Sequence, residues 1–344
     1  MSETALVCAL GGIFAMLFLL PFLPGLAELL RPRDDKPLAI SWDLVKDPLY
    51  FYHAFRRKIY GRLGSAGRWP VRGTLSIFDD ETVELHPYFA AWADRTHENL
   101  IFSYGKLRAG KNSVFLKEAY AAGDASVGEG STLRALAADG SIRLGGSSRV
   151  RRWIGSGGNI SAGPGCDLGV SAACCGKITL GEGCRFRTLY AAEIRTVPPP
   201  GFPPGRMIQK IDLEKYRNIL HRRMQAIEMQ EGMVIPVDIL ARGQLRLGDD
   251  TRSTKSIKSH SNLIVGHGSV IEGGLFSEGD IIIGMNCRIG GNVFSQGEVI
   301  IYPNTTVGRP GAVKSVIGKK SLLLSMNVAI YGQARTEGRG GVVL

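Results

Sequence analysis

The sequence lacks the short motifs that identify most catalytic or cofactor-binding sites. It contains no phosphate-binding P-loop, no G-x-G-x-x-G in a strand–helix context, no H-E-x-x-H and no G-x-S-x-G. Its six cysteines include no C-x-x-C pair, and the adjacent Cys174 and Cys175 are poor disulfide partners. We therefore expect reduced thiols and predict no catalytic residue, cofactor or metal, although the four cysteines between 166 and 184 leave a thiolate site as an alternative.

Histidine and acidic residues are also scarce. The 344 residues include 6 histidines and 31 acidic residues against 42 basic ones, so the formal net charge is +11. This excess favours an anionic partner, namely anionic lipid, nucleic acid or an anionic polymer, without choosing among them. His267 would need a cleft and an orienting carboxylate to act as a general base, so we interpret it as a solvent-exposed corner residue.

Residues 5–27 carry no charge and contain mostly apolar side chains. As a helix they would span ~34 Å, enough for the ~30 Å core of a bilayer. We predict an uncleaved transmembrane anchor within 1–30. A signal peptide is the alternative, but no basic residue precedes the apolar run. Arg31, Arg33 and Lys36 follow it, which predicts a single-pass protein of the bacterial inner membrane with its N-terminus outside and the bulk of the chain cytoplasmic.

The next segments are harder to assign. The juxtamembrane segment 31–64 mixes aromatic and basic residues, and we predict that Arg56, Arg57 and Lys58 contact an anionic membrane surface. An ordinary basic linker helix fits this pattern equally well. Residues 65–100 are predicted to form an irregular capping segment, within which 73–78 has the pattern of a strand.

A phrase of the form G-x-φ-x-φ-G, where φ is apolar or small, recurs at nearly fixed spacing. Its first residues are Gly105, Gly123, Gly140, Gly158 and Gly176, and in a second run Gly243, Ser261, Gly279 and Gly297. Within each run a copy follows the previous one by eighteen positions, or once by seventeen, and a further copy at 320 follows a five-position excess around "GRPGA". A small residue lies three positions after the end of each phrase: Ser113, Ser131, Ser148, Cys166 and Cys184, then Thr251, Ser269, Cys287 and Thr305. Self-similarity of this length indicates a stacked repeat architecture.

The repeat predicts a β-solenoid. Apolar and other residues alternate within each phrase, as in a strand, and the eighteen-position period suits three short strands bent into a triangle. Successive coils would stack ~4.8 Å apart, so that identical positions lie above one another and the cysteines act as small buried hydrophobes. We expect the closing glycines to permit corners with positive φ. The predicted blocks are 101–197 and 237–334, followed by a tail at 335–344.

The insert between the blocks, 198–236, contains a proline-rich linker and then an amphipathic helix. Its apolar stripe is Ile211, Tyr216, Ile219, Leu220 and Ile227, and its basic face is Arg217, His221, Arg222 and Arg223. The helix would pack on the side of the solenoid or contact a membrane or a partner.

The turns at 277–308, with "RIGGNV" at 288–293, resemble those of the bactofilins, polymer-forming cytoskeletal proteins of bacteria. The resemblance covers 237–334 well and 105–196 more faintly. It implies a right-handed triangular β-helix that assembles without nucleotide into a head-to-tail homopolymer. It also implies membrane association and a role as a scaffold for envelope or cell-shape proteins. We expect the bacterial inner membrane as a partner and no nucleic acid. Typical members carry one solenoid domain, whereas this chain has two blocks.

The last apolar coil is the predicted polymerisation interface, because an end coil offers an open strand edge. Its residues are Leu322, Leu323, Leu324, Val328 and Ile330, and core packing in the final coil fits them equally well.

Two other functions stay open. One is a hexapeptide-repeat acyltransferase, a left-handed β-helix with similar Ile-Gly and Val-Gly pairs, here at 283–284, 289–290 and 307–308, and normally a histidine in a cleft between subunits. The other is a platform that binds an anionic polymer through four arginines: Arg149, Arg151, Arg152 and Arg185.

Overall fold

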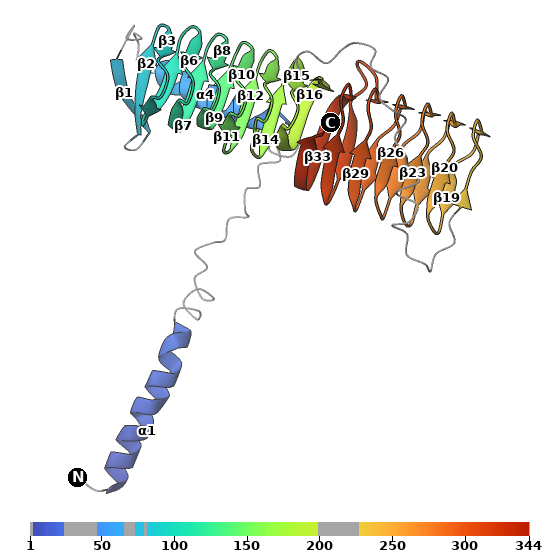
Figure 1. Cartoon of the computed structure of the whole chain (residues 1–344). Coiled ribbons are helices and arrows are strands. Elements are labelled where there is room, and N and C mark those ends of the chain that lie inside the picture. Colours follow the sequence, from blue (N-terminus) through green and yellow to red (C-terminus); the bar gives the residue numbers. More distant parts are fainter. Residues whose placement is uncertain (1–2, 24–46, 65–72, 79–80, 199–226, 344) are drawn as a thin grey trace. The chain divides into compact units, whose positions relative to one another are not determined.

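The computed structural model describes residues 3–23, 47–64, 73–78, 81–198 and 227–343, and it forms two compact units, 1–46 and 47–344 (Figure 1). The first unit contains helix α1 (Glu3–Leu19) and the 3-10 helix η1 (Leu20–Phe22). The second unit contains helix α4 (Tyr50–Gly64) and all 33 strands. This unit is an all-β solenoid of about 13 turns, as the repeat predicts.

The described residues of the predicted transmembrane segment 5–27 form α1 and η1, and residues 24–27 lie outside the described part of the chain. Helix α1 covers 17 residues and ends at Leu19, two residues before Pro21, which lacks the backbone donor that a continuing α-helix needs. None of the helices in the part of the chain that the structure describes is both long and apolar enough to cross a membrane.

The strands form two blocks. Block 1 consists of β1 (Gly73–Phe78), β2 (Glu81–His86), β3 (Phe89–Ala91), β4 (Thr96–His97), β5 (Leu100–Ser103), β6 (Leu107–Ala109), β7 (Val114–Ala121), β8 (Ala125–Val127), β9 (Thr132–Ala138), β10 (Ile142–Leu144), β11 (Arg149–Val150), β12 (Trp153–Ser156), β13 (Ile160–Ala162), β14 (Ser171–Cys174), β15 (Lys177–Leu180) and β16 (Arg185–Thr196). Block 2 consists of β17 (Ile227–Glu228), β18 (Val234–Ile235), β19 (Ile239–Ala241), β20 (Leu245–Leu247), β21 (Arg252–Ser253), β22 (Ile257–Ser259), β23 (Leu263–Val265), β24 (Val270–Ile271), β25 (Leu275–Ser277), β26 (Ile281–Ile283), β27 (Arg288–Ile289), β28 (Val293–Ser295), β29 (Glu298–Ile301), β30 (Thr306–Val307), β31 (Lys314–Gly318), β32 (Ser321–Leu324) and β33 (Ala329–Val342).

Within each block the strands pair in three parallel ladders, and each strand pairs with the equivalent strand of the next coil. In one ladder of block 2, Leu263 pairs with Ile281 and Ile281 with Val299, so both steps equal the period of the repeated phrase. The next step, from Val299 to Leu322, is five positions longer. The predicted five-position excess is therefore confirmed, and it contains the turn in which Arg309 bridges Ala312.

Both blocks differ from the boundaries that we expected. Residues 81–100 contribute strands β2 to β5 of regular coils, and β1 forms an antiparallel hairpin with β2. Within the described residues, block 2 begins at Ile227 rather than 237, and most of the predicted tail 335–344 is part of β33. These strands were missed because their coils lack the glycine-bounded phrase. The predicted helix of the insert lies mostly outside the described residues.

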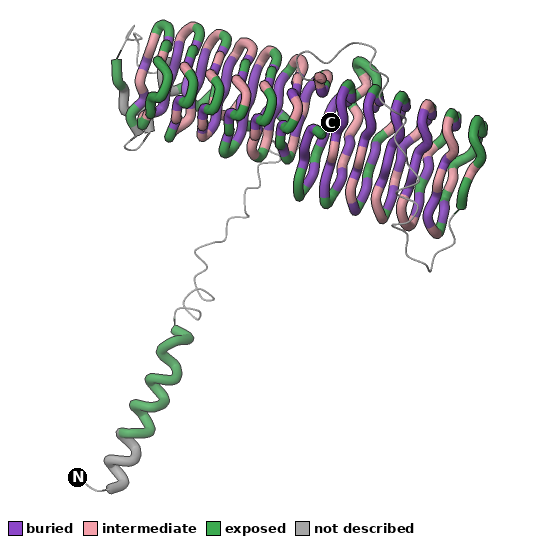
Figure 2. The backbone as a smooth tube through the Cα atoms, in the orientation of Figure 1, coloured by how far each residue is buried: buried purple, intermediate pink, exposed green. Residues whose placement is uncertain are grey.

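One hydrophobic core runs through both blocks. Side chains that point inward, such as Ile142, Ile160 and Ile178, stack above one another and are buried. Figure 2 shows these buried residues recurring coil after coil. Because a single coil buries no apolar face by itself, each coil depends on its neighbours for stability.

The glycines that close the repeated phrases are required for a different reason from the one that we expected. At Gly128 or Gly266 an added methyl group would collide with the backbone of the preceding coil, and neither glycine has a positive φ. The left-handed corner lies two residues later in each coil. It is formed by a column of glycine, asparagine, aspartate and serine residues: Asp94, Asn112, Gly130, Ser147, Gly165 and Gly183, then Gly232, Asp250, Gly268, Asn286, Asn304 and Asn327.

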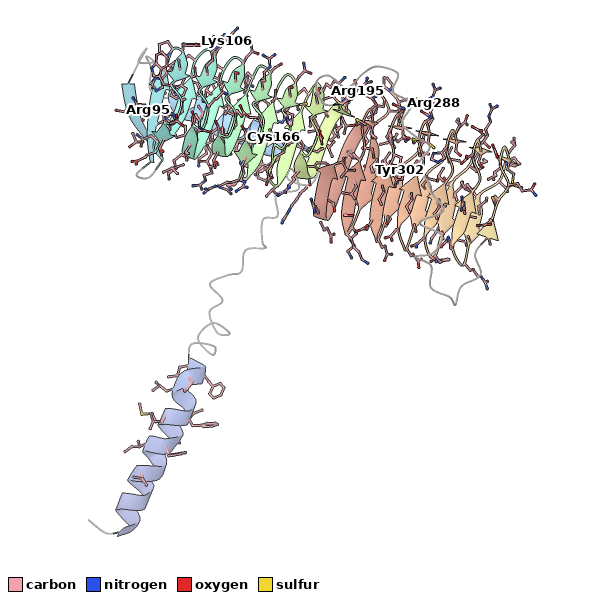
Figure 3. The ribbon with its side chains drawn as sticks, viewed as in Figure 1. Arg95, Lys106, Cys166, Arg195, Arg288 and Tyr302 are labelled. Carbon is pink, nitrogen blue, oxygen red and sulfur yellow. The ribbon has the colours of Figure 1, made fainter. Side chains whose placement is uncertain are left out.

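The column of small residues follows directly after these corners and is buried throughout. Cys166 Sγ donates to the carbonyl of Gly145, and Thr305 Oγ1 to that of Gly284, 21 residues earlier in both cases. Cys166, labelled in Figure 3, lies one coil from Cys184, since Arg185 N donates to the Cys166 carbonyl at 2.8 Å. These small side chains therefore bond one coil to the next.

The two blocks meet at their C-terminal ends. Strand β16, the last of block 1, pairs antiparallel with β33, the last of block 2, from Arg185 opposite Gly341 to Arg195 opposite Ala329. Thr196 Oγ1 donates to the carbonyl of Ser325 at 2.6 Å and accepts from Val328 N at 2.9 Å. We call this the junction.

Candidate functional site

Helix α4 packs on an outer face of block 1. The outward residues of one ladder are large in the first coils, small in the next three and large again in the last: Leu85, Phe102, Tyr120, Ala137, Gly155, Ala173 and Tyr190. A methyl group at Gly155 would overlap Tyr52 of α4, so the small residues leave room for the helix. Ile59 is fully buried against this face.

One carboxylate holds the helix to the coils. Asp139, which follows β9, accepts hydrogen bonds from Tyr52 at 2.7 Å, Tyr60 at 3.3 Å and Tyr120 at 2.5 Å, and from Arg56 Nε at 3.0 Å. Burial, together with the Asp139 carboxylate, raises the pKa of all three tyrosines above the usual value of 10.0. We call these five residues the Asp139 cluster.

The cluster changes the interpretation of the predicted membrane contact. Arg56 binds Asp139 and lies over the ring of Tyr60, 5.3 Å from its centroid, so it is engaged with the protein. Arg57 and Lys58 are exposed on the same helix. The aromatic residues of this segment, such as Tyr52, face the solenoid. This packing accounts for the mixture of aromatic and basic residues from which we predicted a helix on a membrane surface.

The predicted polymerisation interface lies in the junction. Leu322 and Leu324 are inward-facing residues of β32, whose free edge is covered by β33. Val328 and Ile330 are buried, and Ile330 lies opposite Ile194 of β16. This coil therefore offers no open edge. The head-to-tail contact that we expected would need a free C-terminal coil, and the described part of the chain leaves none at the junction.

Open strand edges occur instead at the first coil of block 2. Among the described residues, β17, β18 and β19 each pair on one side only, with β20, β21 and β22. This coil also exposes apolar side chains: Ile227, Met233, Val234, Val237 and Leu240. Val234 is 67% and Leu240 is 62% exposed. Figure 2 shows the concentration of exposed residues there.

The first coil of block 1 has a similar character. Within the described ranges, β3 pairs only with β6 and β4 only with β7, while β1 covers the edge of β2. Trp92 and Tyr88, which flank β3, are exposed. We refer to the first coils of the two blocks as the free ends.

His267, the histidine considered above as a general base, lies inside the repeat. His267 is 8% exposed, so it is buried rather than exposed to solvent, and its Nδ1 accepts the backbone N–H of Met285 at 3.0 Å. Glu278 pairs with His260 at 2.6 Å. In the described residues no group of three or more His, Cys, Asp or Glu side chains could hold a metal ion.

Two of the buried thiols, Cys174 and Cys287, are poor nucleophiles. Burial raises the pKa of Cys174 and of Cys287 to about 12. Cys175, next in the chain, is exposed.

The sequence analysis missed the Asp139 cluster and the free ends. The available signal for the helix-binding face was the small residue at equivalent positions of three successive coils, Ala137, Gly155 and Ala173. Comparisons with protein-family models, with curated proteins and with solved structures found no match to this chain.

Proposed function

We propose that this protein is a membrane-attached scaffold that assembles by joining solenoid ends, without nucleotide. The observation that carries the proposal is the pair of free ends, which combine strand edges paired on one side with exposed apolar side chains. Natural proteins usually protect such edges, so unprotected ones favour strand pairing with another chain.

The junction gives a precedent for this contact within the chain. At β16 and β33 two solenoid ends already join by antiparallel strand pairing and share one core. Contact between the free ends of two chains would form by the same kind of strand pairing and apolar packing.

The resemblance to bactofilins adds further parts to the proposal. These are right-handed winding, a role in organising envelope or cell-shape proteins, and attachment to the bacterial inner membrane through residues 5–27 with the bulk of the chain in the cytoplasm. The exposed apolar side chains of α1, including Phe14 and Phe18, and the exposed Arg57 and Lys58 of α4 support a membrane contact.

The test is a charge placed in the first coil of block 2. Lys258 occupies the position equivalent to Leu240 in the next coil, so the fold accommodates lysine there. We expect Leu240→Lys in the full-length protein to convert filaments or oligomers into smaller species, measured by sedimentation velocity and negative-stain electron microscopy.

The matched control is Phe294→Lys, which places the same charge on the same ladder at a half-exposed position inside block 2. It should assemble like the wild type. If Leu240→Lys and Trp92→Lys both assemble normally while circular dichroism shows an intact β fold, the free ends are not the contact. A wild-type protein that sediments as a single chain at all concentrations would also contradict the proposal.

A further inference from the structure

We propose that a groove at the junction binds a compact anion that carries at least two phosphate groups, supplied either by a soluble oligophosphate or by lipid headgroups. The groove has a volume of about 690 Å³. Five arginines line it: Arg149, Arg151, Arg185, Arg187 and Arg339. We call it the arginine groove.

The fold brings these side chains together from three coils. Arg149 pairs with Asp167 of the next coil, and Asp167 with Arg185 of the coil after it, so Arg149 and Arg185 lie about 10 Å apart at the ~4.8 Å spacing of strands. Arg339 comes from β33 of block 2. Gly338 and Gly340 beside it carry no side chain, which leaves the groove open between the arginines.

The charges in the groove are not balanced. In the described part of the chain, none of the five guanidinium groups forms an ion pair or a side-chain hydrogen bond. Asp167 is the single acidic residue of the lining, and its Oδ1 accepts the backbone N–H of Gly169 at 3.0 Å. Five positive charges against one negative charge in one groove repel one another, and a bound polyanion would relieve this repulsion.

Several basic residues elsewhere in block 1 form ion pairs with neighbouring carboxylates, unlike the five arginines of the groove. Ion pairs join Lys111 to Glu129, Arg134 to Glu118 and Lys177 to Glu193. Among the described residues, the groove is distinguished by five arginines without an ion pair that share one lining.

Arginine is the side chain that best matches phosphate, because its planar guanidinium donates two parallel hydrogen bonds. The volume lies within the roughly 300–1,000 Å³ of small-ligand sites. A long polymer is disfavoured because the basic track is interrupted. Arg152, the fourth arginine of the predicted polymer-binding set, is paired with Glu118 at 3.7 Å and does not line the groove.

The position of the groove gives binding a structural consequence. Its lining comes from both blocks, so an anion that contacts Arg187 and Arg339 links the two strands of the junction. Ligand that binds only the joined blocks stabilises them by mass action. We therefore expect the melting temperature of the full-length protein to rise with tripolyphosphate.

The test compares two double variants that remove the same charge from the same two strands. Arg187→Gln/Arg339→Gln removes arginines of the groove. Arg195→Gln/Arg335→Gln removes exposed arginines of β16 and β33 outside it; Arg195 is labelled in Figure 3. Binding of pyrophosphate and tripolyphosphate is measured by calorimetry, and binding of phosphatidylglycerol or phosphatidylcholine vesicles by flotation.

We expect the groove variant to weaken binding at least tenfold and the control variant to change it less than twofold. Binding of tripolyphosphate identifies a soluble source, and binding of phosphatidylglycerol vesicles alone identifies lipid headgroups. Equal losses in both variants, or no binding of either probe, would overturn the proposal. Tighter binding of a 20-bp DNA duplex than of tripolyphosphate would overturn it in favour of a polymer.

A measurement on the wild type makes the test independent of how the variants fold. Tripolyphosphate should slow hydrogen exchange in β16 and β33, and should leave β20 to β23, far from the groove along the coils, unchanged. Assembly through the free ends is a separate readout, so failure of one proposal does not decide the other.

Discussion

Removal of the Asp139 carboxylate should release helix α4 from block 1. In Asp139→Ala the hydroxyl of Tyr120, a fully buried residue, loses its acceptor. Leaving a buried donor without a partner costs about 1–3 kcal/mol. Tyr52, Tyr60 and Arg56 also lose hydrogen bonds, each contributing about 0.5–1 kcal/mol at a partly solvated site. Because the four donors share one carboxylate, their losses do not add fully, and we expect about 2–4 kcal/mol in total.

Hydrogen exchange of α4 is the direct assay, because local opening of the helix sets its exchange rate. A loss of about 2–4 kcal/mol corresponds to roughly 30- to 700-fold faster exchange. The fluorescence of Trp153 gives a second readout, since its ring stacks on Phe51 of α4 at a centroid distance of 6.0 Å. Its signal should change at lower urea than in the wild type.

Glu129→Ala is the control. It removes a carboxylate whose ion pair with Lys111 is largely exposed, so the expected change is within about 0.5 kcal/mol. Unchanged exchange of α4 in Asp139→Ala would refute the reasoning, because it would mean that apolar packing alone holds the helix.

Three further predictions address stacking, ionisation and thiol reactivity. Gly273→Ala should destabilise block 2 by about 1–3 kcal/mol in urea unfolding, because the methyl group would overlap the preceding coil, whereas Gly61→Ala on α4 meets no atom and should stabilise the helix slightly. The three tyrosines of the Asp139 cluster have raised pKa values, so the folded state holds their protons more tightly, and the urea midpoint of the Trp153 signal should fall as pH rises above 10 but not between pH 7 and 9. Iodoacetamide at pH 8 should label Cys175 in the folded protein and spare Cys174 and Cys287 until urea is added, as read by mass spectrometry; equal labelling would contradict the burial of these thiols.

The solenoid itself was predictable because the stacking constraint repeats in every coil. Each inward position, such as those of Ile160 and Ile281, requires an apolar residue. Each closing position requires glycine because there is no room for a side chain. The repeat can therefore be recognised in the amino-acid sequence. The first coils were missed because, among the described residues, an end coil packs against no preceding coil, so the closing glycines are not required there. Near Ile227 the phrase is accordingly absent.

The candidate sites were harder to predict because they depend on contacts between distant segments. Asp139 accepts hydrogen bonds from Tyr60 and Tyr52, which lie 79 and 87 residues earlier, and nothing in the sequence near Asp139 indicates this. Similarly, Arg339 joins Arg185 and Arg187 only because the blocks meet at their C-terminal ends. The sequence analysis placed the last coil at a free end because the pairing of β16 with β33 joins segments that are far apart in the sequence.

The two strands of the junction are synthesised at different times. Strand β16 is complete at Thr196, but the strand that covers its edge is complete only at Val342, close to the end of the chain. At ~5–20 residues per second the ribosome needs roughly 7–30 s to supply the intervening segment. During that interval the nascent block 1 exposes an unpaired edge that matches β33 of any neighbouring copy. On a polysome, β33 of one chain could therefore pair with β16 of a neighbouring nascent chain, so that block 2 is exchanged between chains. Slower translation would lengthen the interval and increase this exchange.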